Sequence, residues 1–311
     1  MPVAETAGKI KALEIQGATK VAVEAVKALA AELRELEWVE REEAVACLED
    51  SIQVLVGSRP TEPLMRNGLR FVESRVLEAR WSSPGELAEV VGAAEADFLG
   101  MLERAREDMV EVGARRIEDG DTVMTHCHSS AVTGTLLRAH ERGVRFRVLQ
   151  TETRPKYQGR ITARELVEAG VDTTMIVDSA ARYYMKEVDF VLVGCDAITS
   201  EGNVVNKIGT SQVALAAWEA RIPFYVVTTL LKFDPATIRG GYEVIEERET
   251  AEIWENPPKG LKILNPAFDI TRRDYIHGLI TEEGIISPHS ILEAIHRHYP
   301  WMLGGRPSLQ G

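Results

Sequence analysis

The fold of this chain is decided by residues 121–137, which read Asp121-Thr122-Val123-Met124-Thr125-His126-Cys127-His128-Ser129-Ser130-Ala131-Val132-Thr133-Gly134-Thr135-Leu136-Leu137. A short apolar run leads into a polar turn with one cysteine, and then into small and hydroxyl residues suited to the N-cap of a helix. In open α/β sheets, ligands bind outside the carboxyl ends of the strands. The N–H groups of a helix N-terminus also favour the thiolate form of a nearby cysteine. The pattern predicts that Cys127 carries chemistry.

After this stretch, short apolar runs alternate with helical segments. The expected strands lie at 123–124, 146–149, 174–177, 190–193, 224–227 and 278–281, and the expected helices at 130–142, 161–169, 179–186 and 208–220. This alternation predicts βαβ units and a mainly parallel sheet that is covered on both faces.

Before this stretch, residues 6–117 are rich in Ala, Glu and Leu and have the apolar spacing of helices. Two helical stripes are expected, and they consist of Ile10, Leu13, Val21, Val26, Leu29 and Leu33, and of Ala44, Leu48, Ile52 and Leu55. Two further helices are expected at about 65–80 and 85–116. A chain of 311 residues is long for one core. We therefore expect two domains, 1–118 and 119–311.

The composition limits the classes of partner. A formal net charge of -12 gives an average field that repels nucleic acid and anionic lipid. A few local cations or backbone N–H groups still suffice to bind a phosphate. The three cysteines are odd in number and widely spaced, which favours reduced thiols. The sequence has no run of eighteen apolar residues and no signal-peptide pattern at its start, so we expect a cytoplasmic protein without membrane contact.

A second polar interruption follows the apolar run Phe190-Val191-Leu192-Val193. Asp196 stands where the carboxyl end of that strand would meet a ligand, and a poorly solvated aspartate there could act as a general acid or base. Asp196 could equally cap a turn, because aspartates often do so. The local sequence leaves both interpretations open.

Several other polar residues stand where a ligand could reach them. Asn206 could orient a sugar hydroxyl and Lys207 could hold a phosphate, although both could lie in an ordinary exposed loop. Further candidates for ligand contact occur in loops with restricted backbones or at a strand end, and they are Gly17-Ala18-Thr19-Lys20, Arg59, the stretch from Thr153 to Arg160, and Lys232.

His126 and His128 flank Cys127 and raise the question of a metal site. Successive residues of an extended segment point to opposite faces, and no second cluster has ligand spacing, so we expect no metal. Cys47 lies in an apolar helix and is expected to be inert packing, whereas Cys195 could be packing or a wall of the pocket.

Together these motifs resemble one superfamily. It contains archaeal ribose-1,5-bisphosphate isomerases, methylthioribose-1-phosphate isomerases, and the regulatory alpha, beta and delta subunits of the exchange factor for eukaryotic initiation factor two. The resemblance covers roughly residues 10–300 and is carried, in order, by His126-Cys127, Thr151-Glu152-Thr153-Arg154-Pro155 with Gln158-Gly159, Val177-Asp178-Ser179-Ala180, Gly194-Cys195-Asp196-Ala197-Ile198, Asn206-Lys207-Ile208-Gly209-Thr210 and Asn265-Pro266-Ala267-Phe268-Asp269.

The resemblance implies an α/β fold, in which a helical N-terminal domain is followed by a Rossmann-like catalytic domain with a mainly parallel sheet. It implies Cys127 and Asp196 as catalytic residues, a pair that the regulatory subunits typically lack. The phosphate would be held by Gly17, Ala18, Arg59 and Lys232, and the sugar would be oriented by Gln158, Asn206 and Lys207. No cofactor or metal is implied, and homo-oligomers, dimers or hexamers, are common in the superfamily.

The motifs around Cys127, Thr151–Gly159 and Val177–Arg182 look most like the ribose-1,5-bisphosphate isomerases, which act in nucleoside monophosphate breakdown. The chain departs from that pattern at Gln16, where an arginine is usual, and at Cys195, where an alanine is usual. The expected chemistry needs a thiolate at Cys127, with a lowered pKa, and an acid at Asp196, with a raised pKa. The alternatives are a methylthioribose-1-phosphate isomerase and a non-catalytic subunit of the translation machinery.

Overall fold

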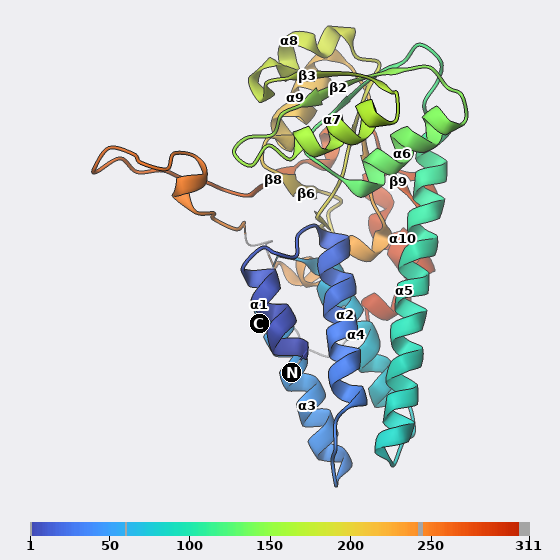
Figure 1. The fold of residues 1–311 in the computed structure, drawn as a ribbon. Helices are drawn as coiled ribbons and strands as arrows, with labels where there is room; N and C mark the ends of the chain where they lie inside the picture. The colour runs from blue at the N-terminus through green and yellow to red at the C-terminus, as the bar shows by residue number, and fades with distance from the viewer. Residues whose placement is uncertain (1, 60, 242–244, 305–311) are drawn as a thin grey trace.

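The computed structural model describes residues 2–59, 61–241 and 245–304 (Figure 1). Its N-terminal part is helical and contains α1 (Pro2–Lys11), α2 (Ala18–Arg34), α3 (Arg41–Ser58), α4 (Pro63–Glu78) and α5 (Pro84–Ala114). The two predicted stripes pack inward, except that Leu13 lies half-buried in the turn after α1. Burial of these stripes holds the helices together, because isolated helices of this length are only marginally stable in water.

The second part is built on a seven-stranded sheet of order β10-β9-β7-β4-β1-β2-β3. Its strands are β1 (Thr122–Thr125), β2 (Arg147–Thr151), β3 (Asp172–Ile176), β4 (Phe190–Val193), β7 (Phe224–Val227), β9 (Gly278–Thr281) and β10 (Gly284–Ile286). All neighbouring strands pair in parallel except β9 and β10, which form an antiparallel hairpin. The α/β prediction and the mainly parallel sheet are therefore confirmed.

Both faces of the central part of the sheet are covered, which explains why β4 and β7 read as continuous apolar runs. Val123 of β1 packs in one apolar cluster with the end of α5, whereas the next residue, Met124, packs in the cluster that includes the N-terminal helices. The helices of this part are α6 (Ser130–Glu141), α7 (Gly159–Glu168), α8 (Ala181–Tyr184), α9 (Thr210–Ala220) and α10 (Ile291–His298).

The two parts of the chain share one core rather than standing apart. The larger apolar cluster runs from Val3 of α1 to Met302 near the C-terminal end of the described residues. The long helix α5 packs on α2 and α4 along most of its length and on α6 and β9 at its end (Figure 1). The division of the chain into two domains, 1–118 and 119–311, stays a prediction.

A second, small sheet was not expected from the sequence. It is antiparallel, has the order β5-β6-β8, and consists of β5 (Ala197–Ile198), β6 (Val204–Lys207) and β8 (Phe268–Thr271). The alternative of an ordinary exposed loop at Asn206 and Lys207 is excluded, because both residues lie in β6, paired with Asp269 and Phe268 of β8. β5 has only two residues and β6 ends in two consecutive polar residues, so neither has the alternation that marks a strand in sequence.

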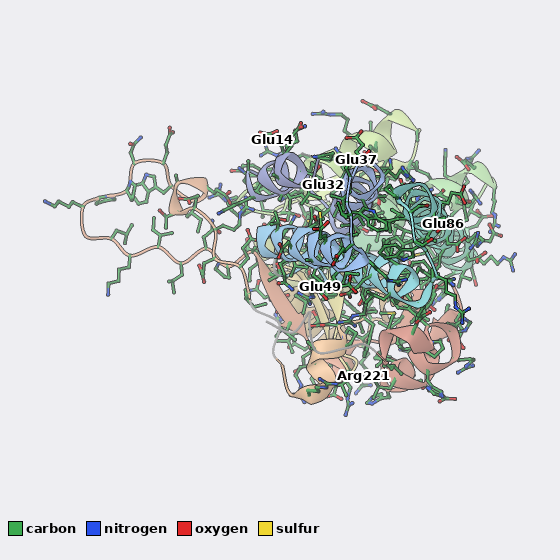
Figure 2. The ribbon with its side chains drawn as sticks, turned by 90° about the horizontal axis from the view of Figure 1, so that it is seen from below. Glu14, Glu32, Glu37, Glu49, Glu86 and Arg221 are labelled. Carbon is green, nitrogen blue, oxygen red and sulfur yellow. The ribbon has the colours of Figure 1, made fainter. Side chains whose placement is uncertain are left out.

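One segment leaves the compact body. Residues 253–264, orange in Figure 1, extend away from the sheet, and Trp254 and Leu264 on this segment are largely exposed. Seen from below, acidic side chains lie on the outside of the helical part, among them Glu14, Glu37 and Glu86 (Figure 2). Within the described ranges, no helix combines the length and the apolar character that crossing a membrane would need.

Candidate active site

The two predicted reactive residues follow adjacent strands at the centre of the sheet. β1 leads into Cys127 and β4 leads into Asp196, and the two strands pair in parallel through Val123 and Phe190. The chain adds β2 and β3 on one side of β1, and β4, β7 and β9 on the other side. β1 is therefore the topological switch point, where open α/β sheets form a crevice at the carboxyl ends of their strands.

The backbone of Cys127 is fixed by hydrogen bonds from three directions. Its N–H donates to the hydroxyl of Thr153 at 2.9 Å, and its carbonyl accepts from Nε2 of Gln150 at 3.0 Å and from the hydroxyl of Thr162 at 3.3 Å. Cys127 has a left-handed backbone, with φ 67°, which is uncommon for a residue other than glycine. The surrounding loops hold this strained turn in place, and the turn ends at Ser129, the N-cap of α6.

Thr153 links Cys127 to the end of β3. It also has a left-handed backbone, with φ 65°, and its N–H donates to Oδ1 of Asp178 at 2.8 Å. The N–H of Arg154 donates to Oδ2 of the same carboxylate at 2.7 Å. Asp178 thus joins the loop after β2 to the end of β3, and Thr153 joins that loop to Cys127.

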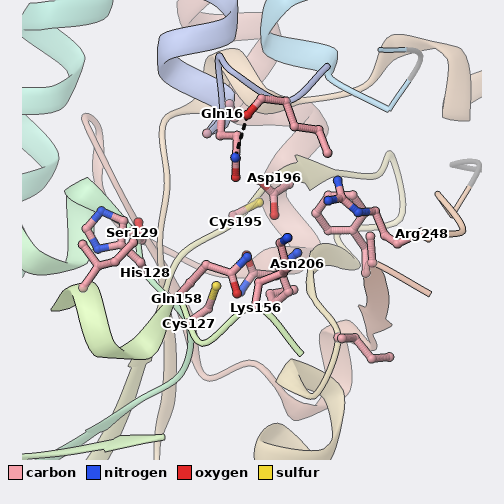
Figure 3. A pocket seen from close by; sticks show the side chains of 18 of the residues that line it. Gln16, Cys127, His128, Ser129, Lys156, Gln158, Cys195, Asp196, Asn206 and Arg248 are labelled. Atoms are coloured by element: carbon pink, nitrogen blue, oxygen red, sulfur yellow. Dashed lines mark hydrogen bonds between the residues drawn. The ribbon is translucent and has the colours of Figure 1, made fainter. Parts of the chain in front are cut away.

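Asp196 lies between β4 and β5. Its N–H donates to the carbonyl of Val205 at 2.9 Å, so the small sheet sets the position of this residue. Its neighbour Cys195 is buried, and the Cys195 thiol donates to the carbonyl of Ala197 at 3.1 Å. The carboxyl of Asp196 and the thiol of Cys127 point into the same space (Figure 3).

The small sheet also carries Asn206 and Lys207 to this space. Nδ2 of Asn206 donates to the hydroxyl of Thr210 at 3.0 Å, and Nζ of Lys207 lies 4.8 Å from the ring centre of Phe268. The next turn passes through Gly209, whose φ of 102° suits glycine and whose N–H donates to Asp269 at 2.8 Å.

Lys232 reaches the site from the turn η3 (Leu230–Lys232) that follows β7. Its ammonium donates to the carbonyl of Cys195. The turn is held from the helical part by Asn67, whose Nδ2 donates to the carbonyls of Leu231 and Phe233, both at 2.8 Å.

The helical part supplies three of the predicted ligand contacts, namely Gly17, Ala18 and Arg59. Gly17, with φ 85°, is the N-cap residue of α2, and as a glycine it has no side chain to accept from the first N–H groups of the helix. These N–H groups therefore favour a bound anion. Arg59 stands just after α3, and its Nε lies 3.2 Å from Oε1 of Glu62.

These elements enclose one cavity of about 560 Å³, a size that suits a small metabolite. All nine residues predicted for the site line it, namely Gly17, Ala18, Arg59, Cys127, Gln158, Asp196, Asn206, Lys207 and Lys232. The buried Oε1 of Gln158 has no hydrogen-bond partner among the described residues, so it is left to accept a bond from a ligand. Gln16 also lines the cavity, and its Nε2 donates to the carbonyl of Leu13 at 2.7 Å (Figure 3).

The expected low pKa of Cys127 is wrong for the protein without a ligand. Burial raises the pKa of the thiol to about 11, even though the ammonium of Lys207 lowers it. The start of α6 does not offset the loss of water around the sulfur, because loops from neighbouring strands close over this turn.

The two flanking histidines have structural partners. Nε2 of His126 lies 2.9 Å from the carbonyl of Ile208 and Nδ1 lies 2.7 Å from the hydroxyl of Thr151, while Nδ1 of His128 lies 3.0 Å from the hydroxyl of Thr162. Burial lowers the pKa of His126. In the part of the chain described here, no group of three His, Cys, Asp or Glu side chains is arranged to hold a metal.

Sequence reasoning missed several residues of the site. Arg248 and Glu252 line the cavity from the base of the extended segment and form an ion pair of 2.7 Å. No local pattern marks them, because they reach the site only through the tertiary fold. Glu62 pairs with Arg59 behind the cavity wall and was also missed, because the two residues flank a loop and do not share a helix on which their spacing would predict an ion pair.

Comparison with known proteins gives the family context. The family described as "Initiation factor 2 subunit family" matches residues 14–288. A ribose 1,5-bisphosphate isomerase from Archaeoglobus fulgidus is 42% identical over 288 residues, which cover 92% of this chain and 90% of the relative. A protein of the same name from Methanocaldococcus jannaschii is 41% identical over 300 residues, which cover 96% of each chain.

Other members of the superfamily are also similar. A methylthioribose-1-phosphate isomerase from Symbiobacterium thermophilum is 36% identical, with 91% of this chain and 84% of the relative covered. The structure of the Pyrococcus horikoshii translation initiation factor eIF-2B matches with a TM-score of 0.79 and 31% identity, covering 92% of this chain and 97% of that chain. The predicted superfamily is confirmed.

Proposed function

This chain belongs to the Initiation factor 2 subunit family, and we propose that it is an aldose–ketose isomerase that converts ribose 1,5-bisphosphate to ribulose 1,5-bisphosphate. The proposal is supported by relatives of that name at about 40% identity over most of the chain. The observation that carries it is that Cys127 and Asp196 line one cavity together with the cations Arg59, Lys207 and Lys232.

The cavity has the charges that a sugar with two phosphates needs. Among the residues that the structure describes, six cationic side chains line it, and they are Lys20, Arg59, Lys156, Lys207, Lys232 and Arg248. One phosphate would bind the N–H groups of Gly17 and Ala18 together with Arg59 and Lys232. Gln158 and Asn206 would orient the sugar, with the unpartnered Oε1 of Gln158 accepting from a hydroxyl.

The proposed chemistry needs two proton carriers. Phosphate on the C1 oxygen blocks ordinary ring opening, so opening must be coupled to loss of the C2 proton. Asp196 would protonate the ring oxygen while the thiolate of Cys127 removes the C2 proton, which leaves an enol phosphate. The thiol would then return the proton to C1, and the hydroxyl proton on C2 would pass to Asp196 as the ketone forms. Both groups end in their starting states.

The raised pKa of Cys127 adds a requirement to this scheme. The thiol is protonated at neutral pH in the protein without a ligand, so the thiolate has to form, by release of the thiol proton to water, before the first transfer. Lys207 is the cation that lowers the pKa of this thiol, and we propose that it favours the thiolate in the complex.

Two other functions predict different results. A methylthioribose-1-phosphate isomerase would use the same two residues on a substrate that ends in an apolar thioether. The cations around the cavity favour the second phosphate instead. A non-catalytic subunit of the translation machinery would bind purified initiation factor without turning over a sugar, and the pair Cys127 and Asp196 would then have no evident use.

Phosphorus NMR tests the proposal directly. The purified protein is incubated with ribose 1,5-bisphosphate and, separately, with methylthioribose 1-phosphate, and Cys127→Ser and Asp196→Asn serve as controls. We expect conversion of the bisphosphate alone, and folded variants that each lose most activity. Conversion of the thioether substrate alone would favour the first alternative, and no conversion of either would favour the second. Substantial turnover by either variant would contradict its assigned role.

Three further proposals follow from the same resemblance. We propose that the protein is a homo-oligomer, either a dimer or a hexamer, which light scattering of the purified chain measures. We also propose that it works in the cytoplasm and that its substrate comes from nucleoside monophosphate breakdown.

A further inference from the structure

Glu62 is a buried carboxyl directly behind the cavity wall. It precedes α4, is 0% exposed, and has one oxygen 3.2 Å from Nε of Arg59. Neither of its oxygens accepts a hydrogen bond from any residue that the structure describes. A buried carboxylate with an ion pair but without hydrogen bonds is costly for stability, which favours a functional reason for its presence.

The charged groups around Glu62 include two cations of the proposed phosphate site and the proposed catalytic acid. Arg59 lines the cavity from the end of α3, Asp196 from the end of β4 and Lys232 from η3, and all three act electrostatically on Glu62. Arg66, in the first turn of α4, is the fourth charged group that acts on it. Glu246 is a second carboxylate near Arg59, at 3.9 Å from Nε, but it is partly exposed.

We propose that Glu62 is a positioning residue, which holds Arg59 at the cavity wall and couples the binding of an anion to the uptake of a proton by its own carboxyl group. The inference rests on the proposed function, because it takes the anion to be a phosphate group of the substrate. In this proposal, Glu62 changes its protonation state when the ligand binds, but it does not contact the ligand.

The charges give the sign of the coupling. Burial raises the pKa of Glu62 to about 7 against the opposing effect of Arg59, so both forms are populated near neutral pH. An anion beside Arg59 and Lys232 disfavours the ionised carboxylate and raises its pKa further. By linkage, the anion binds more tightly when Glu62 is protonated, and its affinity falls as the pH rises through 7.

Calorimetric titration with sulfate tests this coupling without turnover. Sulfate resembles the phosphate group but does not titrate near pH 7, so any proton uptake comes from the protein. Titrations of the full chain are run from pH 6 to 8 in two buffers of different ionisation enthalpy. If sulfate raises the pKa of Glu62 by one unit, the Kd of the wild type rises about fivefold over this range and a fraction of a proton is taken up.

The Kd of Glu62→Gln for sulfate should change less than twofold between pH 6 and 8, and sulfate binding by this variant should take up no proton. The matched control is Glu246→Gln, which removes the partly exposed carboxylate near Arg59 and should keep the proton uptake of the wild type. The inference is overturned if the wild type takes up no proton, if it binds no sulfate at pH 6, or if Glu62→Gln keeps the coupling. A wild type that takes up no proton overturns the inference even if a variant does not fold.

Kinetics separate positioning from a purely structural role. Glu62→Gln keeps an oxygen toward Arg59. Its KM should therefore lose the part of its pH dependence that comes from the titration of Glu62, while kcat changes little. Glu62→Ala removes the support of Arg59 and should raise KM at every pH. The ionisation of the substrate phosphate changes KM with pH equally in the wild type and in both variants, so the difference between the proteins isolates the effect of Glu62. Coupled sulfate binding without isomerisation would refute the proposed function alone, and isomerisation without the coupling would refute only this inference.

Discussion

The N–H of Cys127 donates a hydrogen bond of 2.9 Å to the hydroxyl of Thr153, and both residues have left-handed backbones. This contact joins the turns after two neighbouring strands and holds the backbone that carries the thiol. A reactive group held in this way is preorganised for proton transfer. The turn at Cys127 therefore depends on a side chain from the loop that follows β2.

Replacing Thr153 with Val should weaken this arrangement. The shape and the β-branching are retained, but the buried N–H of Cys127 loses its acceptor, which should cost about 1–3 kcal/mol of stability. We expect kcat to fall about tenfold because the thiol is held less well. Urea unfolding and the phosphorus NMR assay measure the two effects. Thr153→Ser keeps the hydroxyl and should stay within about twofold of the wild type, and equal rates for Val and Ser would contradict this account.

Cys127 should react slowly with iodoacetamide at neutral pH. Burial raises the pKa of its thiol to about 11, and only the thiolate is alkylated. The rate should increase about tenfold for each pH unit between 7 and 9, as peptide mass spectrometry can show. Lys207→Met removes the cation that lowers this pKa and should slow the labelling further. Labelling at pH 7 as fast as in the urea-unfolded chain would show that the thiol is already activated without a ligand.

His126 should take up its proton at a lower pH in the folded chain than in the unfolded chain. The carbonyl of Ile208 can only accept, so Nε2 carries the proton and Nδ1 accepts from Thr151. Burial lowers the pKa of His126, so its contribution to stability is fully present above the unfolded value of 6.5 and is lost as the pH falls below it.

Nitrogen NMR of the imidazole can identify this tautomer. Urea unfolding at several pH values should show that the destabilisation caused by His126→Gln shrinks as the pH decreases from 7 to 5. A constant difference between the two proteins over this range would mean that His126 takes up its proton equally in the folded and unfolded states.

Gly159 should tolerate no side chain. A Cβ at this position would lie 1.9 Å from the carbonyl oxygen of Thr151, so Gly159→Ala should cost at least about 3 kcal/mol or prevent folding. In contrast, a Cβ at Gly57 in α3 would meet no atom within 4 Å, and Gly57→Ala should stabilise the chain by about 0.5–1 kcal/mol. Thermal unfolding of both variants measures the difference, and similar melting temperatures would refute the predicted close approach.

Much of the fold could be predicted because burial leaves a regular pattern in the sequence. Val21, Leu29 and Leu33 form a helical stripe, and all three are buried in α2. The run Phe190–Val193 is apolar throughout because alternate residues of β4 pack against opposite layers. The small sheet could not be predicted, since β6 contains Asn206 and Lys207 and its partner β8 follows some sixty residues later.

The sequence by itself determined that Cys127 and Asp196 end two strands of a parallel sheet, because strand ends and turns are encoded locally by apolar runs and polar interruptions. Only the tertiary structure decided that β1 and β4 are neighbours and that Arg59 from the helical part joins their cavity. It also decided the charge states of the site. The pKa values of Cys127 and Glu62 depend on how completely distant segments exclude water from them, and that exclusion comes from packing between elements far apart in the chain.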